Sequence, residues 1–219
     1  MRFELIVFDW DGTLVDSSDA IAEAVRSAAT GAGLPVPTIA AARNIIGLGL
    51  REVAERLFPG ASDAELAGFG EAFRDLYWAA PDSFTRPFAG IDGLLTELAG
   101  RAPLAVATGK GRRGLDAALV RTGLGRHFAG SRTADETRSK PHPQMLIELM
   151  DELGVAPAST LMVGDTSFDM EMARAAGAHG LGVLGGSHED SELREAGASV
   201  VLGATVDLGP WLKARYEPD

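Results

Sequence analysis

Short apolar runs that alternate with helix-periodic segments constrain the fold of this chain more than any other sequence feature. Five runs have the length and composition of buried strands, at residues 5–8, 104–107, 160–163, 180–183 and 199–202. Apolar residues recur at three- and four-residue spacing, which is typical of helices, in segments 116–123, 144–153 and 168–176. Strands that alternate with helices form βαβ units, so we predict an α/β fold with a doubly wound, Rossmann-like parallel sheet.

The stretch 17–86 interrupts this alternation, because it contains several helix-like segments in succession and no convincing strand. Its apolar residues share three helix faces: Ile21, Ala24, Val25 and Ala28; Val53, Leu57 and Phe58; and Leu66, Phe69, Phe73, Leu76 and Tyr77. We predict that 17–86 is an all-helical cap domain inserted into an α/β catalytic core of residues 1–16 and 87–219. Such a cap would cover the carboxyl edge of the sheet, where ligands of open α/β sheets bind.

The charge balance and the residue usage exclude several classes of protein. Lysine and arginine contribute 20 charges against 31 from aspartate and glutamate, and the resulting net charge of −11 repels nucleic acid and anionic membranes. The absence of cysteine excludes disulfide scaffolds, thiol nucleophiles and cysteine zinc sites. No apolar stretch approaches the ~18 residues of a membrane helix, and residues 1–8 lack the features of a signal peptide. We therefore expect a cytoplasmic protein with neither a nucleic-acid nor a membrane partner.

Two aspartates directly follow the first predicted strand, in the run Asp9-Trp10-Asp11-Gly12-Thr13. Because Gly12 lets the backbone turn there, both carboxylates can face one site at the edge of the sheet. The pair could bind Mg²⁺, or one carboxylate could attack a phosphorus atom while the other transfers protons. A solvated turn is the alternative. A calcium-binding EF-hand loop is disfavoured, because its glycine belongs at the sixth position and Gly12 is at the fourth.

A second acidic turn follows the predicted strand 160–163 and carries Asp165 and Asp169. Helix capping is the alternative role for these residues. However, two acidic strand ends on one sheet edge call for a cation, since unpaired like charges repel each other. Thr108, the amide next to Gly109 and the ammonium of Lys140 supply the groups that the oxygens of a phosphoryl group require.

Two weaker patterns point to other kinds of site. Residues 109–114 match the Gly-x-Gly-x-x-Gly pattern of dinucleotide-binding turns, but they do not follow the strand that opens the fold. The four histidines are dispersed and lack the spacing of a zinc site. Neither pattern outweighs the acidic strand ends.

As an ordered set, the motifs resemble those of the haloacid dehalogenase-like hydrolase superfamily. The set comprises the aspartates of run 9–13, Thr108, Lys140 with Pro141, and Asp165 with Asp169. The helical insert after the first motif and the run 87–90 (Pro-Phe-Ala-Gly) resemble the phosphoglycolate phosphatase-like branch of that superfamily. The likeness extends over essentially the whole chain.

The resemblance implies a role for each motif residue. Asp9 would be the nucleophile that forms an aspartyl-phosphate, while Asp11 would protonate the leaving oxygen and then activate the hydrolytic water. Thr108 and Lys140 would hold the transferring phosphoryl group.

The resemblance also implies Mg²⁺ as the cofactor. Its ligands would be Asp9, Asp165 and the backbone carbonyl of Asp11, with Asp169 in support.

Contacts with the substrate are expected from Thr13, Gly109 and Arg51. Arg51 ends the run 47–51 (Gly-Leu-Gly-Leu-Arg), which resembles the cap loop that approaches the active site in this branch. Its guanidinium could pair with a substrate carboxylate, as phosphoglycolate would require. A solvated helix position is the alternative for Arg51.

Together these features predict a Mg²⁺-dependent phosphatase of small phosphorylated metabolites, with phosphoglycolate as the leading candidate substrate. The presence of Asp11 argues against a dehalogenase, and the absence of lysine from 17–86 argues against a phosphonatase. A sugar phosphomutase and a non-catalytic protein that binds a phosphorylated ligand remain as alternatives. We expect a monomer or a homodimer.

Overall fold

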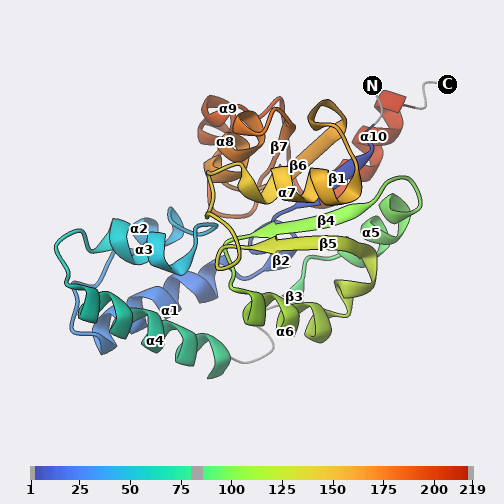
Figure 1. Cartoon of the computed structure of the whole chain (residues 1–219). Coiled ribbons are helices and arrows are strands. Elements are labelled where there is room, and N and C mark those ends of the chain that lie inside the picture. Colours follow the sequence, from blue (N-terminus) through green and yellow to red (C-terminus); the bar gives the residue numbers. More distant parts are fainter. Residues whose placement is uncertain (1–2, 80–85, 217–219) are drawn as a thin grey trace.

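The computed structural model describes residues 3–79 and 86–216 and confirms the predicted α/β fold with a doubly wound parallel sheet (Figure 1). The strands of this sheet are β1 (Leu5–Phe8), β4 (Leu104–Thr108), β5 (Phe128–Thr133), β6 (Thr160–Gly164), β7 (His179–Val183) and β8 (Val200–Leu202). They follow the order β5-β4-β1-β6-β7-β8, and all neighbouring pairs are parallel. Residues that follow β1 are therefore flanked by the carboxyl ends of β4 and β6.

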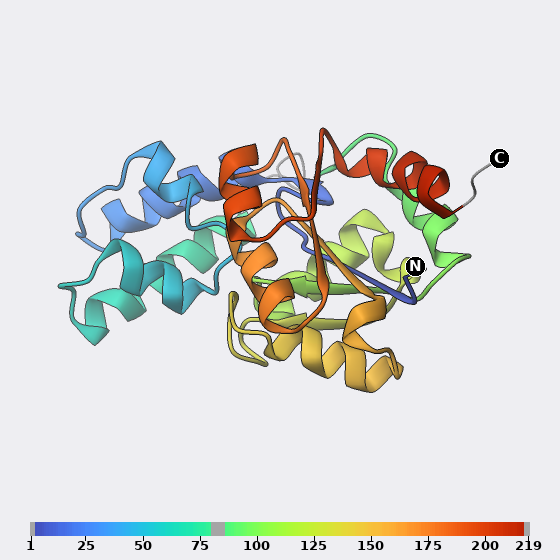
Figure 2. The same ribbon diagram turned by 90° about the horizontal axis from the view of Figure 1, so that it is seen from above.

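Helices cover both faces of the sheet (Figures 1 and 2). One layer consists of α7 (Gln144–Leu153), α8 (Ser167–Ala175) and α9 (Asp190–Ala196). The other consists of α5 (Ile91–Ala99), α6 (Arg112–Thr122) and α10 (Leu208–Tyr216). Short 3₁₀ turns occur at η2 (Leu124–His127), η3 (Pro157–Ser159) and η4 (Thr205–Asp207).

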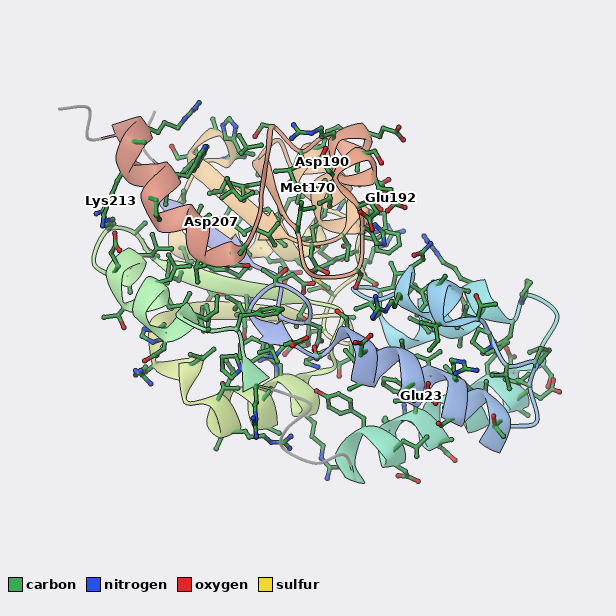
Figure 3. The ribbon with its side chains drawn as sticks, turned by 180° about the vertical axis from the view of Figure 1, so that it is seen from behind. Glu23, Met170, Asp190, Glu192, Asp207 and Lys213 are labelled. Atoms are coloured by element: carbon green, nitrogen blue, oxygen red, sulfur yellow. The ribbon has the colours of Figure 1, made fainter. Side chains whose placement is uncertain are left out.

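Alternation along β1 builds the apolar core on both sides, because successive side chains of a strand point to opposite faces. Leu5 and Val7 share a buried cluster with residues of α7 and α8, whereas Ile6 and Phe8 belong to the cluster that includes α5, α6 and α10. On the first side, Met170 of α8 is buried in a small cluster with residues of α9 (Figure 3). The sheet is thus buried on both faces, as its apolar strands require.

Four helices form a separate group at one side of the sheet, which we call the helical segment (Figures 1 and 2). They are α1 (Ser18–Gly31), α2 (Ile39–Arg43), α3 (Leu50–Leu57) and α4 (Asp63–Ala79). The segment has its own apolar cluster, in which the rings of Phe58 and Phe69 meet edge to face at 5.2 Å. It is flanked by β2 (Val15–Asp16) and β3 (Arg86–Pro87), which pair as an antiparallel ribbon. None of the described helices is long and apolar enough to cross a membrane.

The observed elements differ from the predicted ones in a few places. All five predicted strands are present, but β5 and the β2–β3 ribbon were not predicted, nor were α5, α9 and α10. β5 is an edge strand of the sheet whose sequence, FAGSRT, mixes small and polar residues after Phe128, so it lacks the apolar run of a buried strand. α6 begins at Arg112, four residues before the predicted start. Parts of the predicted core (1–2 and 217–219) and of the predicted cap (80–85) lie outside the described residues.

Candidate active site

Asp9 lies at the centre of the carboxyl edge of the sheet. Its backbone amide donates to the carbonyl of Val163 at 2.9 Å, which continues the pairing of β1 with β6 by one residue. The side chain is 1% exposed, and its Oδ1 lies 2.7 Å from Nζ of Lys140. Oδ2 is also buried and has no hydrogen-bond partner in the described part of the chain. Asp9 therefore offers one carboxylate oxygen for a ligand.

Lys140 places a positive charge between two carboxylates. It follows β5 in the chain, and its ammonium lies 2.7 Å from Oδ1 of Asp9 and 2.6 Å from Oδ1 of Asp169. Burial alone lowers the pKa of an amine, but Asp169 and Asp9 raise the pKa of Lys140 above its ordinary value. Lys140 thus stays charged inside the protein.

Three buried carboxylates, two of which contact this ammonium, lie close together. Ligand oxygens of Asp9, Asp165 and Asp169 all lie within 4.8 Å of one another. Burial raises the pKa of Asp9 well above its usual range, and burial together with the charge of Asp169 raises the pKa of Asp165 to about 7. One ammonium cannot balance three carboxylates, so the group has the oxygen donors and the excess negative charge that fit a hard divalent cation such as Mg²⁺.

Asp165 is fixed by hydrogen bonds and by two closely approaching glycines. The hydroxyl of Thr13 donates to its Oδ1 at 2.8 Å, and the amide of Ser187 donates to its Oδ2 at 2.8 Å. A Cβ atom would lie 2.3 Å from Asp165 Oδ2 at Gly12 and 2.0 Å from it at Gly186. Gly12 also has a φ of +79°, a conformation that favours glycine. Only glycine fits at these two positions without moving the carboxylate.

Asp169 has the helix-capping role considered for it from the sequence, and it also pairs with Lys140. Its Oδ2 accepts hydrogen bonds from the amide and the hydroxyl of Thr166, at 3.1 and 2.7 Å, as part of a capping box at the start of α8. Its Oδ1 faces Lys140. The cap fixes the orientation of the carboxylate that pairs with the ammonium.

Asp11 faces a different set of partners. The hydroxyl of Ser17 donates to its Oδ1 at 2.6 Å, and Nζ of Lys110 lies 2.8 Å from its Oδ2. The ammonium of Lys110 also lies 2.7 Å from the hydroxyl of Tyr77, on α4 of the helical segment. The carboxylate of Asp11 is therefore not a member of the three-carboxylate group, and it is held at the boundary between sheet and helical segment.

The loop before α3 brings the helical segment against the motif residues of the sheet edge. The amide of Gly49 donates to the hydroxyl of Ser139 at 2.7 Å, next to Lys140. A Cβ atom at Gly109 would lie 2.4 Å from the carbonyl oxygen of Leu48. Thr108, the residue before Gly109, is buried. Its hydroxyl accepts a hydrogen bond from the amide of Lys110 at 3.2 Å. This loop therefore closes over the ends of β4 and β5.

The structure brings Asp9, Lys140, Asp165 and Asp169 into one group, with Thr13 bound to Asp165. Arg51 lies at the edge of a cavity between sheet and helical segment; its side chain is 86% exposed and pairs with Glu55 at 2.8 Å. Ser17, Tyr77 and Lys110 were not predicted as residues of the site. The available signal for Lys110 was its place directly after Thr108 and Gly109, in a chain with three lysines.

Known proteins resemble this chain in sequence and in structure. The model of the haloacid dehalogenase-like hydrolase family matches residues 6–183. Phosphoglycolate phosphatase 1 of Pseudomonas aeruginosa is 30% identical over 218 residues, covering 94% of this chain and 78% of that protein. N-acetylmuramic acid 6-phosphate phosphatase of the same organism is 30% identical over 215 residues, covering 95% and 94%. A solved hydrolase structure from Pseudomonas syringae has a TM-score of 0.88 at 24% identity, covers 96% of this chain and 98% of its own, and shares the fold.

Proposed function

The chain belongs to the haloacid dehalogenase-like hydrolase family, and we propose that it is a Mg²⁺-dependent phosphatase that hydrolyses small phosphomonoesters through a phosphorylated Asp9. The observation that carries this proposal is the buried Oδ2 of Asp9, which has no hydrogen-bond partner in the described part of the chain. A carboxylate oxygen in that setting is available to attack a phosphorus atom. The neighbouring ammonium of Lys140 can bind the oxygens of the phosphoryl group.

The reaction divides into two displacements at phosphorus. In the first, Oδ2 of Asp9 forms a bond to phosphorus, the bond to the leaving oxygen breaks, and Asp11 gives that oxygen a proton. In the second, Asp11 takes a proton from a water molecule that attacks the aspartyl-phosphate, so that phosphate leaves and both aspartates return to their starting states. Thr108 and Lys140 would hold the phosphoryl oxygens during both steps.

Mg²⁺ would be held by Asp9, Asp165 and the backbone carbonyl of Asp11, with Asp169 in support. When bound, the ion supplies neutralising charge to the phosphoryl oxygens. The hydrogen bonds of Thr13 and Ser187 keep Asp165 oriented toward the site, and the capping box of α8 does the same for Asp169. The protein's part is therefore to present ligands whose positions are set before the substrate arrives.

The identity of the substrate needs a direct test. Two relatives from one organism have the same identity to this chain and carry names with two different substrates, so that level of identity does not select between them. Phosphoglycolate is one candidate substrate, because its carboxylate could pair with Arg51. Sugar phosphates are the other candidates, because the name of one relative contains a sugar phosphate. All of these are small phosphorylated metabolites.

The experiment is to measure phosphate release by the purified protein, with Mg²⁺ and with EDTA. The compounds tested are phosphoglycolate, sugar phosphates and acetyl phosphate. Asp9→Asn serves as the blank. Gly93→Ala is the matched control, because Gly93 lies in α5 and a Cβ atom there meets nothing within 4 Å. We expect release that requires Mg²⁺, disappears in Asp9→Asn and persists in Gly93→Ala. Release from no compound, or equal release by Asp9→Asn, would contradict the proposal.

A further inference from the structure

A cavity of about 470 Å³ lies between the helical segment and the sheet, and it reaches the site at Asp11 and Lys110. This position matters because, under the proposed function, Asp11 protonates the oxygen of the leaving group. The carbon skeleton attached to that oxygen must therefore extend away from phosphorus on the side of Asp11. The cavity provides space on that side.

Most of the side chains that the helical segment contributes to this cavity are apolar, and Arg51, Glu52 and Arg74 are the charged ones. The apolar ones include side chains of α1, α3 and α4, among them Ile21, Val25, Leu50, Val53 and Phe73. Tyr77 continues the same surface, because its ring stacks on that of Phe73 with centroids 6.1 Å apart. Apolar walls favour an apolar ligand, whereas a polyhydroxylated one needs hydrogen-bonding side chains along its length.

Two cations of the cavity, Lys110 and Arg51, already have partners on the protein. The ammonium of Lys110 is already shared between Asp11 and Tyr77. The guanidinium of Arg51 is largely exposed and pairs with Glu55. The other charged lining residues have mixed signs: Arg74 and Arg113, Glu52 and Asp135. The charge of the lining therefore does not select a second anionic group.

The volume of the cavity also favours a substrate larger than phosphoglycolate. Pockets of about 300 to 1,000 Å³ typically bury ligands of drug size, which are far larger than a two-carbon acid. We propose, building on the phosphatase function above, that the substrate is a phosphomonoester whose alcohol carries an apolar body, aromatic or branched alkyl, that fills this cavity. Burial of each methylene group of that body then multiplies kcat/KM by about fourfold.

The test compares alkyl phosphates whose alcohols have similar basicity, so that differences in rate report binding and not leaving-group chemistry. We would measure kcat/KM of the wild-type protein with Mg²⁺ for ethyl, hexyl and 3-phenylpropyl phosphate and for phosphoglycolate. The expected order is 3-phenylpropyl above ethyl by at least about tenfold, with phosphoglycolate no better than ethyl phosphate. Equal values for the ethyl and 3-phenylpropyl esters, or a clear preference for phosphoglycolate, would overturn the inference.

Acetyl phosphate separates failure of this inference from failure of the proposed function. Its small, activated leaving group needs no cavity, so the wild-type protein should hydrolyse it and Asp9→Asn should not. If acetyl phosphate is cleaved and the alkyl series is flat, the apolar substrate class is wrong and the phosphatase stands. If neither acetyl phosphate nor the esters are cleaved, both are wrong.

A variant pair on α4 locates the effect in the cavity. Phe73→Ala should lower the 3-phenylpropyl to ethyl ratio of kcat/KM at least about fivefold, because it removes an aromatic ring from the apolar lining. Leu76→Ala is the matched control, since Leu76 is on the same helix, 41% exposed, and not part of the lining. An unchanged ratio in folded Phe73→Ala overturns the inference. If that variant does not fold, inhibition of the wild type decides: 3-phenylpropanol should compete with substrate far better than ethanol, and equal inhibition overturns the inference.

Discussion

The ammonium of Lys110 lies 2.8 Å from Oδ2 of Asp11, the residue proposed to transfer protons. Its second contact, 2.7 Å to the hydroxyl of Tyr77, comes from α4. Lys110 thereby connects Asp11 with the helical segment. Burial lowers the pKa of Lys110, but Asp11 and Tyr77 outweigh that effect and raise it above the ordinary value. The position of the Asp11 carboxylate thus depends on a contact between sheet and helical segment.

Replacement of Lys110 by Met should impair leaving groups that need a proton more than those that do not. Without the ammonium, the Ser17 hydroxyl is the one remaining side-chain partner of the Asp11 carboxylate among residues 3–79 and 86–216. We expect kcat/KM for ethyl phosphate to fall about a hundredfold, and kcat/KM for acetyl phosphate to fall much less. Steady-state kinetics of both substrates measure this.

Lys213→Met is the control for that variant, because Lys213 lies on α10, far from the helical segment (Figure 3). It should behave as the wild type with both substrates. Equal losses for ethyl and acetyl phosphate in Lys110→Met would mean that Lys110 does not act through proton transfer by Asp11.

Replacement of Gly109 by Ala should disturb the contact between the loop before α3 and the end of β4. The new Cβ would lie 2.4 Å from the carbonyl oxygen of Leu48, so the backbone of the loop must move. We expect kcat/KM to fall at least about tenfold, because a small displacement near the reacting groups costs orientation. Hydrogen exchange at the amide of Gly49, which donates to Ser139, should become faster. Wild-type activity and exchange in this variant, with Gly93→Ala as control, would show that the contact is dispensable.

The metal-free protein should lose stability as the pH rises, through Asp165. Its pKa is about 7 in the folded state against 3.8 ordinarily, so the folded state holds a proton that the unfolded chain has released. This contribution to stability is fully present below about pH 4 and is lost as the pH rises through about 7. The raised pKa of Asp9 acts in the same direction.

A bound cation competes with these protons, so the rise in Tm that Mg²⁺ causes should be larger at about pH 8 than at about pH 6. Thermal unfolding in Mg²⁺ and in EDTA at both pH values measures it. Asp165→Asn should remove most of the effect, whereas Asp116→Asn, at an exposed side chain of α6, should retain it. A Tm shift that is the same at both pH values in the wild type would argue against Asp165 as a ligand.

Much of the fold could be predicted because the central strands are buried on both faces. All residues of β1 and β6 are buried, and such strands appear in a sequence as continuous apolar runs. The β2–β3 ribbon has two residues in each strand and forms only because the chain returns from the helical segment to the sheet. Local sequence carries no signal for such a pairing.

The candidate site could likewise be predicted only in part from the sequence. Asp9 and Asp165 directly follow β1 and β6, which are neighbouring parallel strands, so the topology places these two carboxylates together. Lys140 reaches them from the loop after β5, a strand that was not predicted, and Asp169 from the first turn of α8. The contact of Lys110 with Tyr77 spans 33 residues and depends on how the helical segment sits on the sheet. The orientation of Arg51 reflects local competition, since Glu55 lies one helical turn away.

The most direct test of covalent catalysis by Asp9 is mass spectrometry of the protein after acid quench during turnover. Asp11→Asn should be used beside the wild type with acetyl phosphate as substrate. Its leaving group needs no proton from Asp11, so the phosphorylated form still forms, and loss of the base for water attack lets it accumulate. We predict that one phosphoryl group appears on the peptide that contains Asp9, that it requires Mg²⁺, and that it is absent from Asp9→Asn. Turnover without phosphorylated Asp9, or a phosphoryl group on another residue, would contradict the proposed mechanism.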